Sequence, residues 1–363
     1  MGGAPRRHPV RAWVDLASPG HPFFFRSLLA GLDGVTARTT AREKTETVPL
    51  ARELGIEHTV VGRDYDRPLA RKFGIPYRTL QLVRRMPPCD VSLSLRNAMC
   101  VLASRVRGVP SVHFTDNDIM RHDEGVTGES VYARLEAAAT HNVVPAAFDT
   151  TVLTDRGADP ERVHRFDGTK EDLYVADFDP DPAFGDRVPF DPGSYVVVRP
   201  EALDATYVHA ERSLVPALLD RFVERGVGVV YLPRGRGDRG HAAPYDPTDV
   251  YVPSEPLDGL QLAWHARCVL TGSGTMAREA AAMETPAVSF FPGPLLSVDR
   301  DLTERGRLFH SRDPAAVVEH VGSTEPTPGG DTERARRVRR EAVDLTADLI
   351  DRCVDHSPTP PRD

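Results

Sequence analysis

The sequence predicts an α/β protein built from two parallel β-sheets, each covered by helices. Short apolar runs alternate with helical patterns along most of the 363 residues, which is the order expected of strand–helix–strand units. This alternation breaks at 177–192 (DFDPDPAFGDRVPFDP), whose Asp, Pro and Gly content is typical of a linker. The length also fits two domains. We therefore predict domains at 1–176 and 193–322, a linker at 177–192, and a C-terminal helix at 332–353 that packs back on the domains.

The first half opens with a strand, a tight turn and a helix. Val10–Leu16 (VRAWVDL) is typical of a buried strand, Ser18-Pro19-Gly20 turns the chain, and FFFRSLLAGL has the apolar spacing of a helix ending near Gly31. The same cycle then recurs. The further elements predicted here are strands at 35–38, 58–61, 91–93, 111–115 and 151–154 and helices at 45–54 and 96–105.

The strand–helix order resumes after the linker. The predicted elements are strands at 195–198, 227–232, 268–271 and 287–290 and helices at 213–225, 257–266 and 276–283. Beyond them, STEPTPGG is typical of a loop, and the last helix is charged and amphipathic.

Composition narrows the functional classes. Acidic residues number 53 against 45 basic ones, giving a net charge of -8, which argues against nucleic acid as a partner. The four cysteines form no C-x-x-C pair, so neither a zinc ribbon nor a disulfide scaffold is indicated, and a cytoplasmic location is expected. No apolar stretch reaches the length of a signal peptide core or a membrane span, so any membrane contact is expected to be peripheral.

The strongest functional motif follows the predicted strand at 268–271. Gly272-Ser273-Gly274-Thr275 leads into a helical pattern, so backbone N–H groups converge at the positive end of the helix dipole, an arrangement that suits a diphosphate. Glu279 lies one turn later and can accept hydrogen bonds from a ribose diol. The alternative is structural, with the two hydroxyls capping the helix and Glu279 solvated.

This segment resembles the C-terminal nucleotide-binding motif of GT-B proteins, particularly non-hydrolysing UDP-N-acetylglucosamine 2-epimerases and related glycosyltransferases. Thr275, Glu279, Ala280 and Pro286 occupy the places where that pattern has Thr or Gly, Glu, Ala and Pro. The whole chain resembles a mostly archaeal GT-B-like family of unassigned function. The motifs that carry this resemblance are WVDLASPGHPFFF, HFTDND, GTKEDLYVADFDPDP, VVVRP and GSGTM. The resemblance implies two Rossmann-type domains with parallel sheets facing across a cleft.

The resemblance also implies that the C-terminal domain binds the nucleotide and that the N-terminal domain carries the acceptor-binding or catalytic groups. Arg199 and Arg234 each end a predicted strand, where guanidinium groups suit a diphosphate, although surface ion pairs are the alternative. The predicted nucleotide-binding residues are Arg199, Arg234, Gly272, Ser273, Gly274, Thr275, Met276 and Glu279.

Asp15 and His21 are the first catalytic candidates. Asp15 ends the first strand and His21 opens the next helix, so the pair can form a base and the carboxylate that orients it. The alternative for His21 is a helix cap. The family pattern has Asn and Pro before this histidine, whereas this chain has Ser18-Pro19-Gly20.

A second cluster of candidates follows the strand predicted at 111–115. It consists of His113, Asp116, Asp118, His122, Asp123 and Glu124. Asp116-Asn117-Asp118 imitates an acid-x-acid metal motif, which leaves metal binding as one alternative. The motif lies in the half opposite the nucleotide motif, so we assign no metal ligands to it. Catalysis by Asp116 or Asp118 without a metal is the functional hypothesis, and a solvated turn is the alternative.

These observations predict a metal-independent glycosyltransferase that uses a UDP-sugar as substrate and needs no cofactor. The helix N-terminus and an arginine stabilise the leaving diphosphate, and Asp15, His21 or Asp116 deprotonates the acceptor. A UDP-N-acetylglucosamine 2-epimerase-like enzyme and a non-catalytic nucleotide-sugar-binding protein are the alternatives. The basic stretch 334–341 fits a lipid-linked acceptor or a solvated helix face, and a glycan acceptor and a homodimer also stay open.

Overall fold

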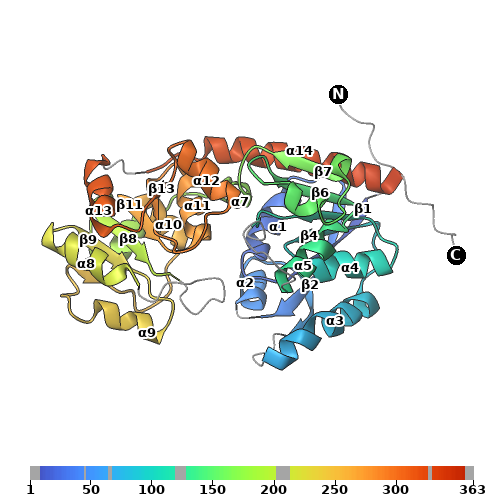
Figure 1. The fold of residues 1–363 in the computed structure, drawn as a ribbon, viewed down its shortest axis with the longest axis horizontal. Coiled ribbons are helices and arrows are strands. Elements are labelled where there is room, and N and C mark those ends of the chain that lie inside the picture. The colour runs from blue at the N-terminus through green and yellow to red at the C-terminus, as the bar shows by residue number, and fades with distance from the viewer. Residues whose placement is uncertain are drawn as a thin grey trace. The chain divides into compact units, whose positions relative to one another are not determined.

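The computed structural model divides the chain into two compact units (Figure 1). The residues that it describes are 9–44, 46–63, 68–118, 128–201, 213–325 and 329–355. Unit 1 comprises Met1–Tyr174 and Arg337–Asp363, and unit 2 comprises Val175–Arg336. The chain therefore returns to unit 1 within its last helix, α14 (Glu333–Asp355).

Unit 1 contains a seven-stranded parallel sheet in the order β3-β2-β1-β4-β5-β6-β7. The strands are β1 (Val10–Leu16), β2 (Val35–Glu43), β3 (His58–Arg63), β4 (Val91–Leu95), β5 (Ser111–Phe114), β6 (His141–Pro145) and β7 (Val163–Phe166). The helices are α1 (His21–Ala30), α2 (Thr47–Glu53), α3 (Pro68–Arg85), α4 (Ala98–Val106), α5 (Gly128–Ala137), α6 (Thr151–Thr154) and α7 (Lys170–Val175), with a 3-10 turn at Pro160–Arg162. The strand order reverses between β1 and β4, which creates a switch point at their carboxyl ends.

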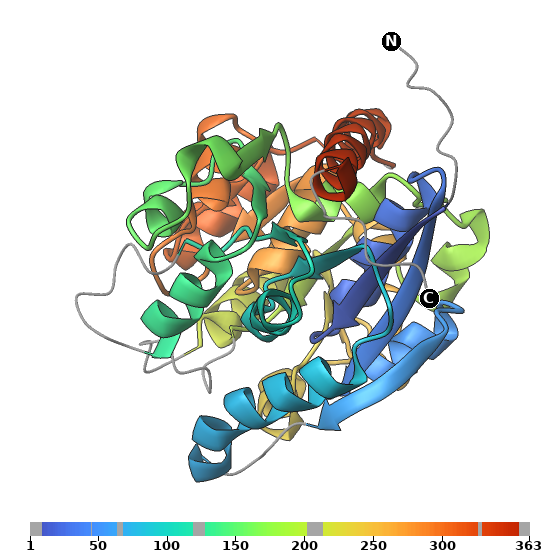
Figure 2. The same ribbon diagram turned by 90° about the vertical axis from the view of Figure 1, so that its right-hand side faces the viewer.

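The central strands of unit 1 are buried along nearly their whole length, as expected of a parallel sheet covered on both faces. Phe24, Phe25 and Leu28 of α1 pack against them. Helix α14 adds Val338 and Ile350 to the same core, and Figure 2 shows it (red) beside the strands of unit 1 (blue). The amphipathic C-terminal helix is thus part of the unit 1 core.

Unit 2 contains a six-stranded parallel sheet in the order β10-β9-β8-β11-β12-β13. The strands are β8 (Tyr195–Arg199), β9 (Gly228–Tyr231), β10 (Val250–Tyr251), β11 (Cys268–Thr271), β12 (Ala287–Ser289) and β13 (Phe309–His310). The helices are α8 (Val215–Glu224), α9 (Arg236–Arg239), α10 (Gly259–His265), α11 (Gly274–Ala282), α12 (Ser297–Glu304) and α13 (Pro314–Ser323), with 3-10 turns at Pro182–Arg187 and Gly240–Ala242. The switch point of this sheet lies between β8 and β11.

The stretch predicted as a linker, 177–192, instead belongs to unit 2. Phe178 contacts Trp264 with ring centroids 5.3 Å apart, and the buried Phe184 stacks on His265 at 5.8 Å. Gln261 of the same helix, α10, accepts a hydrogen bond from the Asp181 N–H at 3.0 Å. Phe178 and Phe184 therefore pack this stretch against α10 within unit 2.

The two parallel α/β sheets confirm the predicted fold class. One predicted strand is wrong, because 151–154 (TVLT) forms α6. Its β-branched residues suggest a strand, but Val152 and Leu153 pack in a small cluster beside α5. The strand at this place in the sheet is β6, which the sequence analysis missed together with α3, α5 and β7. Among the described helices, none combines the length and apolarity that a membrane crossing requires.

Candidate functional site

The loop between β11 and α11 lies at the switch point of unit 2. The Gly272 N–H donates to the Arg199 carbonyl oxygen at 3.0 Å, and the Ser273 N–H donates to Thr271 Oγ1 at 2.9 Å. Ser273 is the N-cap residue in an extended conformation, but its hydroxyl makes no capping hydrogen bond. The first N–H groups of a helix have no partner within the helix, so this end of α11 presents uncapped donors.

Close packing explains the glycines of this loop. A Cβ atom on Gly272 would lie 2.6 Å from Glu201 Cα, and one on Gly274 would lie 3.2 Å from Arg278 Nη2. Arg278 is itself buried and forms a two-pronged ion pair with Asp299 at 2.7 and 2.8 Å. The loop is therefore held against fixed backbone and a fixed guanidinium group, so its N–H groups are pre-positioned.

The other residues predicted to bind the nucleotide differ in exposure. Thr275 is exposed on the first turn of α11, and Glu279 is half-buried one turn later. Met276 is buried, and a Cβ atom on Gly259 of α10 would lie 3.7 Å from its Cε. Its side chain therefore packs inside unit 2, which leaves only its backbone N–H for a ligand.

Arginines surround the carboxyl edge of this sheet. Arg199 ends β8 and pairs in register with Thr271, whereas Arg234 is exposed and its Nε donates to the Pro200 carbonyl oxygen at 2.9 Å. Arg312, which the sequence analysis missed, follows β13 and donates to the Phe290 carbonyl oxygen at 2.8 Å. No spacing in the sequence marked Arg312, because only the sheet order brings its strand to this edge.

Asp15 lies in β1 at the switch point of unit 1 and is completely buried. Arg78 Nη2 donates to both carboxylate oxygens at 2.9 and 2.8 Å, Thr40 Oγ1 donates at 2.6 Å and Asn97 Nδ2 donates at 2.7 Å. These four bonds join β1 to β2, α3 and the start of α4. The carboxylate is thus an anchor for the switch point. Its hydrogen-bond partners are residues other than His21, on which Asp15 acts through its charge and its backbone.

His21 begins α1 and is 4% exposed. The Ala17 N–H donates to His21 Nδ1 at 3.1 Å, which places the ring proton on Nε2. Burial lowers the pKa of the imidazole from 6.5 to about 3, and the nearby Lys170 acts in the same direction, whereas Asp15 opposes it. A neutral imidazole protonated on Nε2 presents a hydrogen-bond donor at that atom.

Asp116 follows β5 and is 6% exposed, and it pairs with the ammonium group of Lys170 at the start of α7. The same ammonium lies 2.8 Å from Glu171 Oε1, so it is shared by two carboxylates. Asp118 is also buried, two residues further on. Lys170 is a functional candidate that the sequence analysis missed, although it lies in the quoted GTKEDL motif and is one of only three lysines in the chain.

His113 belongs to a different, fully buried network. Its Nδ1 lies 2.8 Å from Ser94 Oγ and its Nε2 lies 3.4 Å from Glu136 Oε1. Burial raises the pKa of Glu136, but Arg96 and His113 outweigh it and hold that pKa below its usual range. The remaining cluster members, His122, Asp123 and Glu124, lie outside the described residues. Within the described part of the chain, no group of three or more His, Cys, Asp or Glu side chains is arranged to hold a metal ion.

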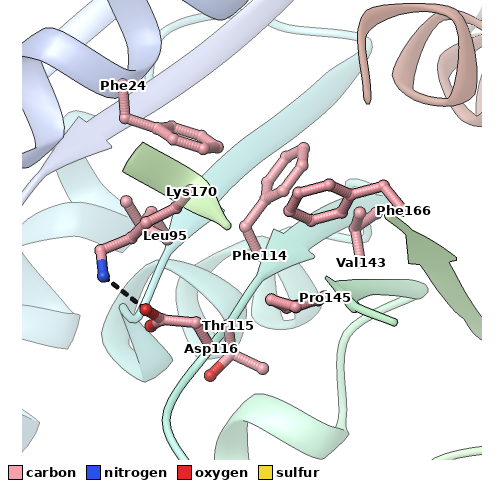
Figure 3. Close-up of a pocket in the computed structure, with 9 residues that line it drawn as sticks. All are labelled: Phe24, Leu95, Phe114, Thr115, Asp116, Val143, Pro145, Phe166 and Lys170. Atoms are coloured by element: carbon pink, nitrogen blue, oxygen red, sulfur yellow. Dashed lines mark hydrogen bonds and ion pairs between the residues drawn. The ribbon is translucent and has the colours of Figure 1, made fainter. Parts of the chain in front are cut away.

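A small hollow with room for about one water molecule lies beside the Lys170–Asp116 pair (Figure 3). It is lined by Phe24, Leu95, Phe114, Thr115, Asp116, Val143, Pro145, Phe166 and Lys170. These residues come from α1, from the ends of β4 to β7 and from the start of α7. Open α/β sheets bind ligands at this edge, so the hollow and the Lys170–Asp116 pair form the candidate site of unit 1.

A family model matches nearly the whole chain. A profile described as "Protein of unknown function (DUF354)" matches residues 10–355. The chain belongs to this family. An uncharacterized relative from Methanocaldococcus jannaschii is 29% identical over 127 residues, which are 35% of this chain and 36% of that protein. The match thus spans about a third of the relative's length.

Solved structures share the fold over nearly the whole chain. The UDP-N-acetylglucosamine 2-epimerase from Rickettsia bellii has a TM-score of 0.72 at 13% identity and covers 96% of this chain and 98% of its own. The UDP-GlcNAc 2-epimerase from Methanocaldococcus jannaschii gives 0.65 at 12% identity, with 93% and 99% covered. The glycotransferase of kitacinnamycin gives 0.58 at 14% identity, with 96% and 100% covered. The DUF354 chain therefore has the GT-B-like fold of these proteins.

Proposed function

We propose that this DUF354 protein binds a nucleoside-diphosphate sugar through the β11–α11 loop of unit 2. The observation that carries the proposal is the uncapped N-terminus of α11, whose N–H groups follow Gly272 and a serine hydroxyl that makes no cap. Such an end binds the oxygens of a diphosphate. The Methanocaldococcus jannaschii epimerase solved with UDP-GlcNAc and UDP, TM-score 0.66 at 13% identity, supports a nucleotide sugar as the ligand class.

The reaction that we propose is glycosyl transfer from a UDP-type donor. The bond between the anomeric carbon and the diphosphate breaks, and the acceptor oxygen forms the new glycosidic bond. The negative charge that develops on the leaving diphosphate is stabilised by the N–H groups of α11 and by Arg199. Asp116, kept next to the Lys170 ammonium, accepts the proton of the acceptor hydroxyl, and the His21 Nε2–H donates to an oxygen that gains negative charge.

Epimerisation of a nucleotide sugar is the second candidate. It is favoured by the TM-scores, which are higher for the epimerases of Rickettsia bellii (0.72) and Methanocaldococcus jannaschii (0.65) than for the glycotransferase (0.58). Both reactions require the diphosphate to be bound in the same way. A first test therefore measures nucleotide binding, and a second test identifies the product.

Binding is tested by thermal unfolding with UDP, GDP, ADP and their sugar conjugates. A ligand at 100 times its Kd stabilises the folded state by about 2.7 kcal/mol. Ser273→Ala removes the hydroxyl that does not cap α11, so it is expected to reduce the ligand-induced shift without lowering the Tm of the free protein. Ser323→Ala, at an exposed serine ending α13, is the matched control. A shift with none of these compounds would refute the proposal.

The product is tested by incubation with UDP-N-acetylglucosamine in the absence of an acceptor. Transfer predicts at most slow hydrolysis, whereas epimerisation predicts a second sugar nucleotide that differs at one carbon and is visible by NMR. Binding with neither product, also after a panel of acceptors has been added, would assign the chain to non-catalytic nucleotide-sugar binders.

A further inference from the structure

Arg312 lies at the carboxyl edge of the unit 2 sheet, where its side chain reaches across neighbouring strand ends. It follows β13, and its Nη1 donates to the Phe290 carbonyl oxygen just after β12 at 2.8 Å and to Glu201 Oε1 just after β8 at 3.3 Å. In the sheet, β11 lies between β8 and β12. The guanidinium group therefore spans the carboxyl end of β11, where the chain enters the β11–α11 loop.

Both partners of Arg312 adjoin the start of this loop. The Phe290 N–H donates to the Thr271 carbonyl oxygen at 3.1 Å, and a Cβ atom on Gly272 would lie 2.6 Å from Glu201 Cγ. The Glu201 side chain thus packs directly against the loop, and the Arg312 guanidinium group packs against that side chain. A positive charge is therefore fixed beside the N–H groups that we propose bind a diphosphate.

The hydrogen bonds of Arg312 use only one of its three nitrogens. Its Nε and Nη2 make no hydrogen bond to any described residue, and both atoms reach solvent, since the side chain is 32% exposed. In Arg278 the same two nitrogens form a planar fork that donates to both carboxylate oxygens of Asp299 at 2.7 and 2.8 Å. Such a fork binds a phosphate group in the same two-pronged way.

Bracing of Glu201 is the alternative role of Arg312, but Glu201 has closer partners. Glu201 is 2% exposed, and its carboxylate accepts the Ser213 hydroxyl at 2.7 Å and the Leu214 N–H at 3.0 Å. The contact with Arg312, at 3.3 Å, is longer than both. Two shorter hydrogen bonds therefore already satisfy this carboxylate, and the Arg312 guanidinium group keeps donors for a ligand.

We propose that the Nε–Nη2 fork of Arg312 binds one phosphate of a nucleoside diphosphate while the N–H groups of α11 bind the other. This inference rests on the proposed function for the ligand, and it adds what the site selects, namely a second phosphate group next to the first. The guanidinium group neutralises the charge that the second phosphate brings, whereas a monophosphate occupies only one of the two places. Arg312 thus determines the preference for diphosphates over monophosphates.

The test measures the Kd of the full chain for UDP, UMP and inorganic pyrophosphate by calorimetry. The wild-type chain is expected to prefer UDP to UMP and to bind pyrophosphate, which carries no base. Arg312→Met removes the charge and the fork, so it is expected to raise the Kd for UDP and pyrophosphate about tenfold to a hundredfold, the loss of charge-assisted hydrogen bonds. The Kd for UMP should rise much less. Arg312→Lys keeps the charge without the fork and is expected to give intermediate values.

Two further variants separate a phosphate contact from a structural role. Arg267→Met is the matched control, because Arg267 Nη2 also donates to a carbonyl oxygen of unit 2, that of Val321 at 3.0 Å, but Arg267 precedes β11 at the opposite edge of the sheet. It should leave every Kd unchanged. Glu201→Gln keeps the shape of the side chain but removes the negative charge beside Arg312, so UDP binding should stay equal or become tighter. A brace that acted through Glu201 would instead weaken UDP binding in Glu201→Gln as much as in Arg312→Met.

The outcomes separate this inference from the proposed function. Loss of the preference for UDP in Arg312→Met, with UDP binding retained in Glu201→Gln, supports the inference. Unchanged UDP affinity in Arg312→Met, equal losses for UDP and UMP, or an equal loss in Glu201→Gln or Arg267→Met would overturn it. If Arg312→Met does not fold, an unchanged ratio of UDP to UMP affinity in Arg312→Lys would overturn it in the same way.

UDP binding that does not depend on Arg312 contradicts the inference and leaves the proposed function intact. Pyrophosphate binding that depends on Arg312, without binding of any nucleotide, contradicts the proposed function alone. A wild-type chain that binds neither pyrophosphate nor a nucleotide contradicts both.

Discussion

Replacement of His21 by asparagine is expected to make folding stability less sensitive to acid. Asparagine keeps an acceptor for the Ala17 N–H but carries no titratable group. Burial lowers the pKa of His21 to about 3 in the folded chain, whereas the imidazole titrates near 6.5 when exposed. At pH values between about 3 and 6.5 the unfolded state binds a proton at His21 and the folded state does not, so folding stability falls as the pH drops below 6.5.

The magnitude follows from the size of this shift. Each unit between the pH and 6.5 changes the free energy of unfolding by about 1.36 kcal/mol. The wild-type chain is therefore expected to lose about 2 kcal/mol through His21 between pH 8 and pH 5, and about 3.4 kcal/mol by pH 4. The His21→Asn chain lacks this contribution, although it loses the ring contact with Phe25 at every pH.

The assay is urea unfolding of both chains at pH 8 and pH 5. The quantity compared is the loss of unfolding free energy between the two pH values, so the pH-independent cost of the substitution cancels. A loss smaller by about 2 kcal/mol in His21→Asn is expected. Equal losses would mean that His21 titrates normally, and the assignment of His21 as a neutral Nε2–H donor would then be wrong.

Three further predictions concern the β11–α11 loop, the buried Asp15–Arg78 ion pair and the cysteines. Gly272→Ala places a methyl group 2.6 Å from Glu201 Cα, so it is expected to lower the free energy of unfolding by about 1–3 kcal/mol and to abolish the UDP-induced Tm shift. Gly322→Ala is the control, because its methyl group would enter open space; it should change neither the stability nor the Tm shift. Asp15→Asn leaves Arg78 buried without a counter-charge, so urea unfolding should show a free energy of unfolding lower by about 3–5 kcal/mol. The double variant with Arg78→Met should recover part of this loss, whereas additive losses would contradict the pairing. Burial raises the pKa of the half-buried Cys89 to about 11 and the other three cysteines are buried, so a thiol reagent at pH 8 should modify Cys89 slowly and no other thiol until urea is added; fast labelling of several thiols would contradict this.

Local patterns in the sequence predicted much of the fold. The run Val10–Leu16 forms β1 within the predicted bounds, and Cys268–Thr271 forms β11 in the same way. Both strands are buried along nearly their whole length, because both faces of a parallel sheet are covered. The pattern failed at 151–154, where β-branched residues occur in a short helix. It also failed at β6 (HNVVP), which has only two consecutive apolar residues between polar ones and a proline.

The candidate site was predictable only as a set of positions. Asp15 lies near the carboxyl end of β1, and His21 and Asp116 follow β1 and β5, as their places in the sequence predicted. Their chemical states were not predictable, because Lys170, which pairs with Asp116, is 54 residues away in the chain. Arg78, which neutralises Asp15, lies 63 residues away and carries no motif.

The sequence by itself determined two parallel α/β sheets and the strand–glycine–helix loop that ends in α11, because strand burial, turns and helix starts are set by residues close together in the chain. Only the tertiary structure decided that Asp15 is held by Arg78, that His21 is buried beside the Ala17 N–H and that 177–192 packs against α10. Hydrogen bonds, burial and ring contacts between distant residues set these properties. The hollow beside Lys170 belongs to the same class, since α1, β4 to β7 and α7 each supply only one part of its wall.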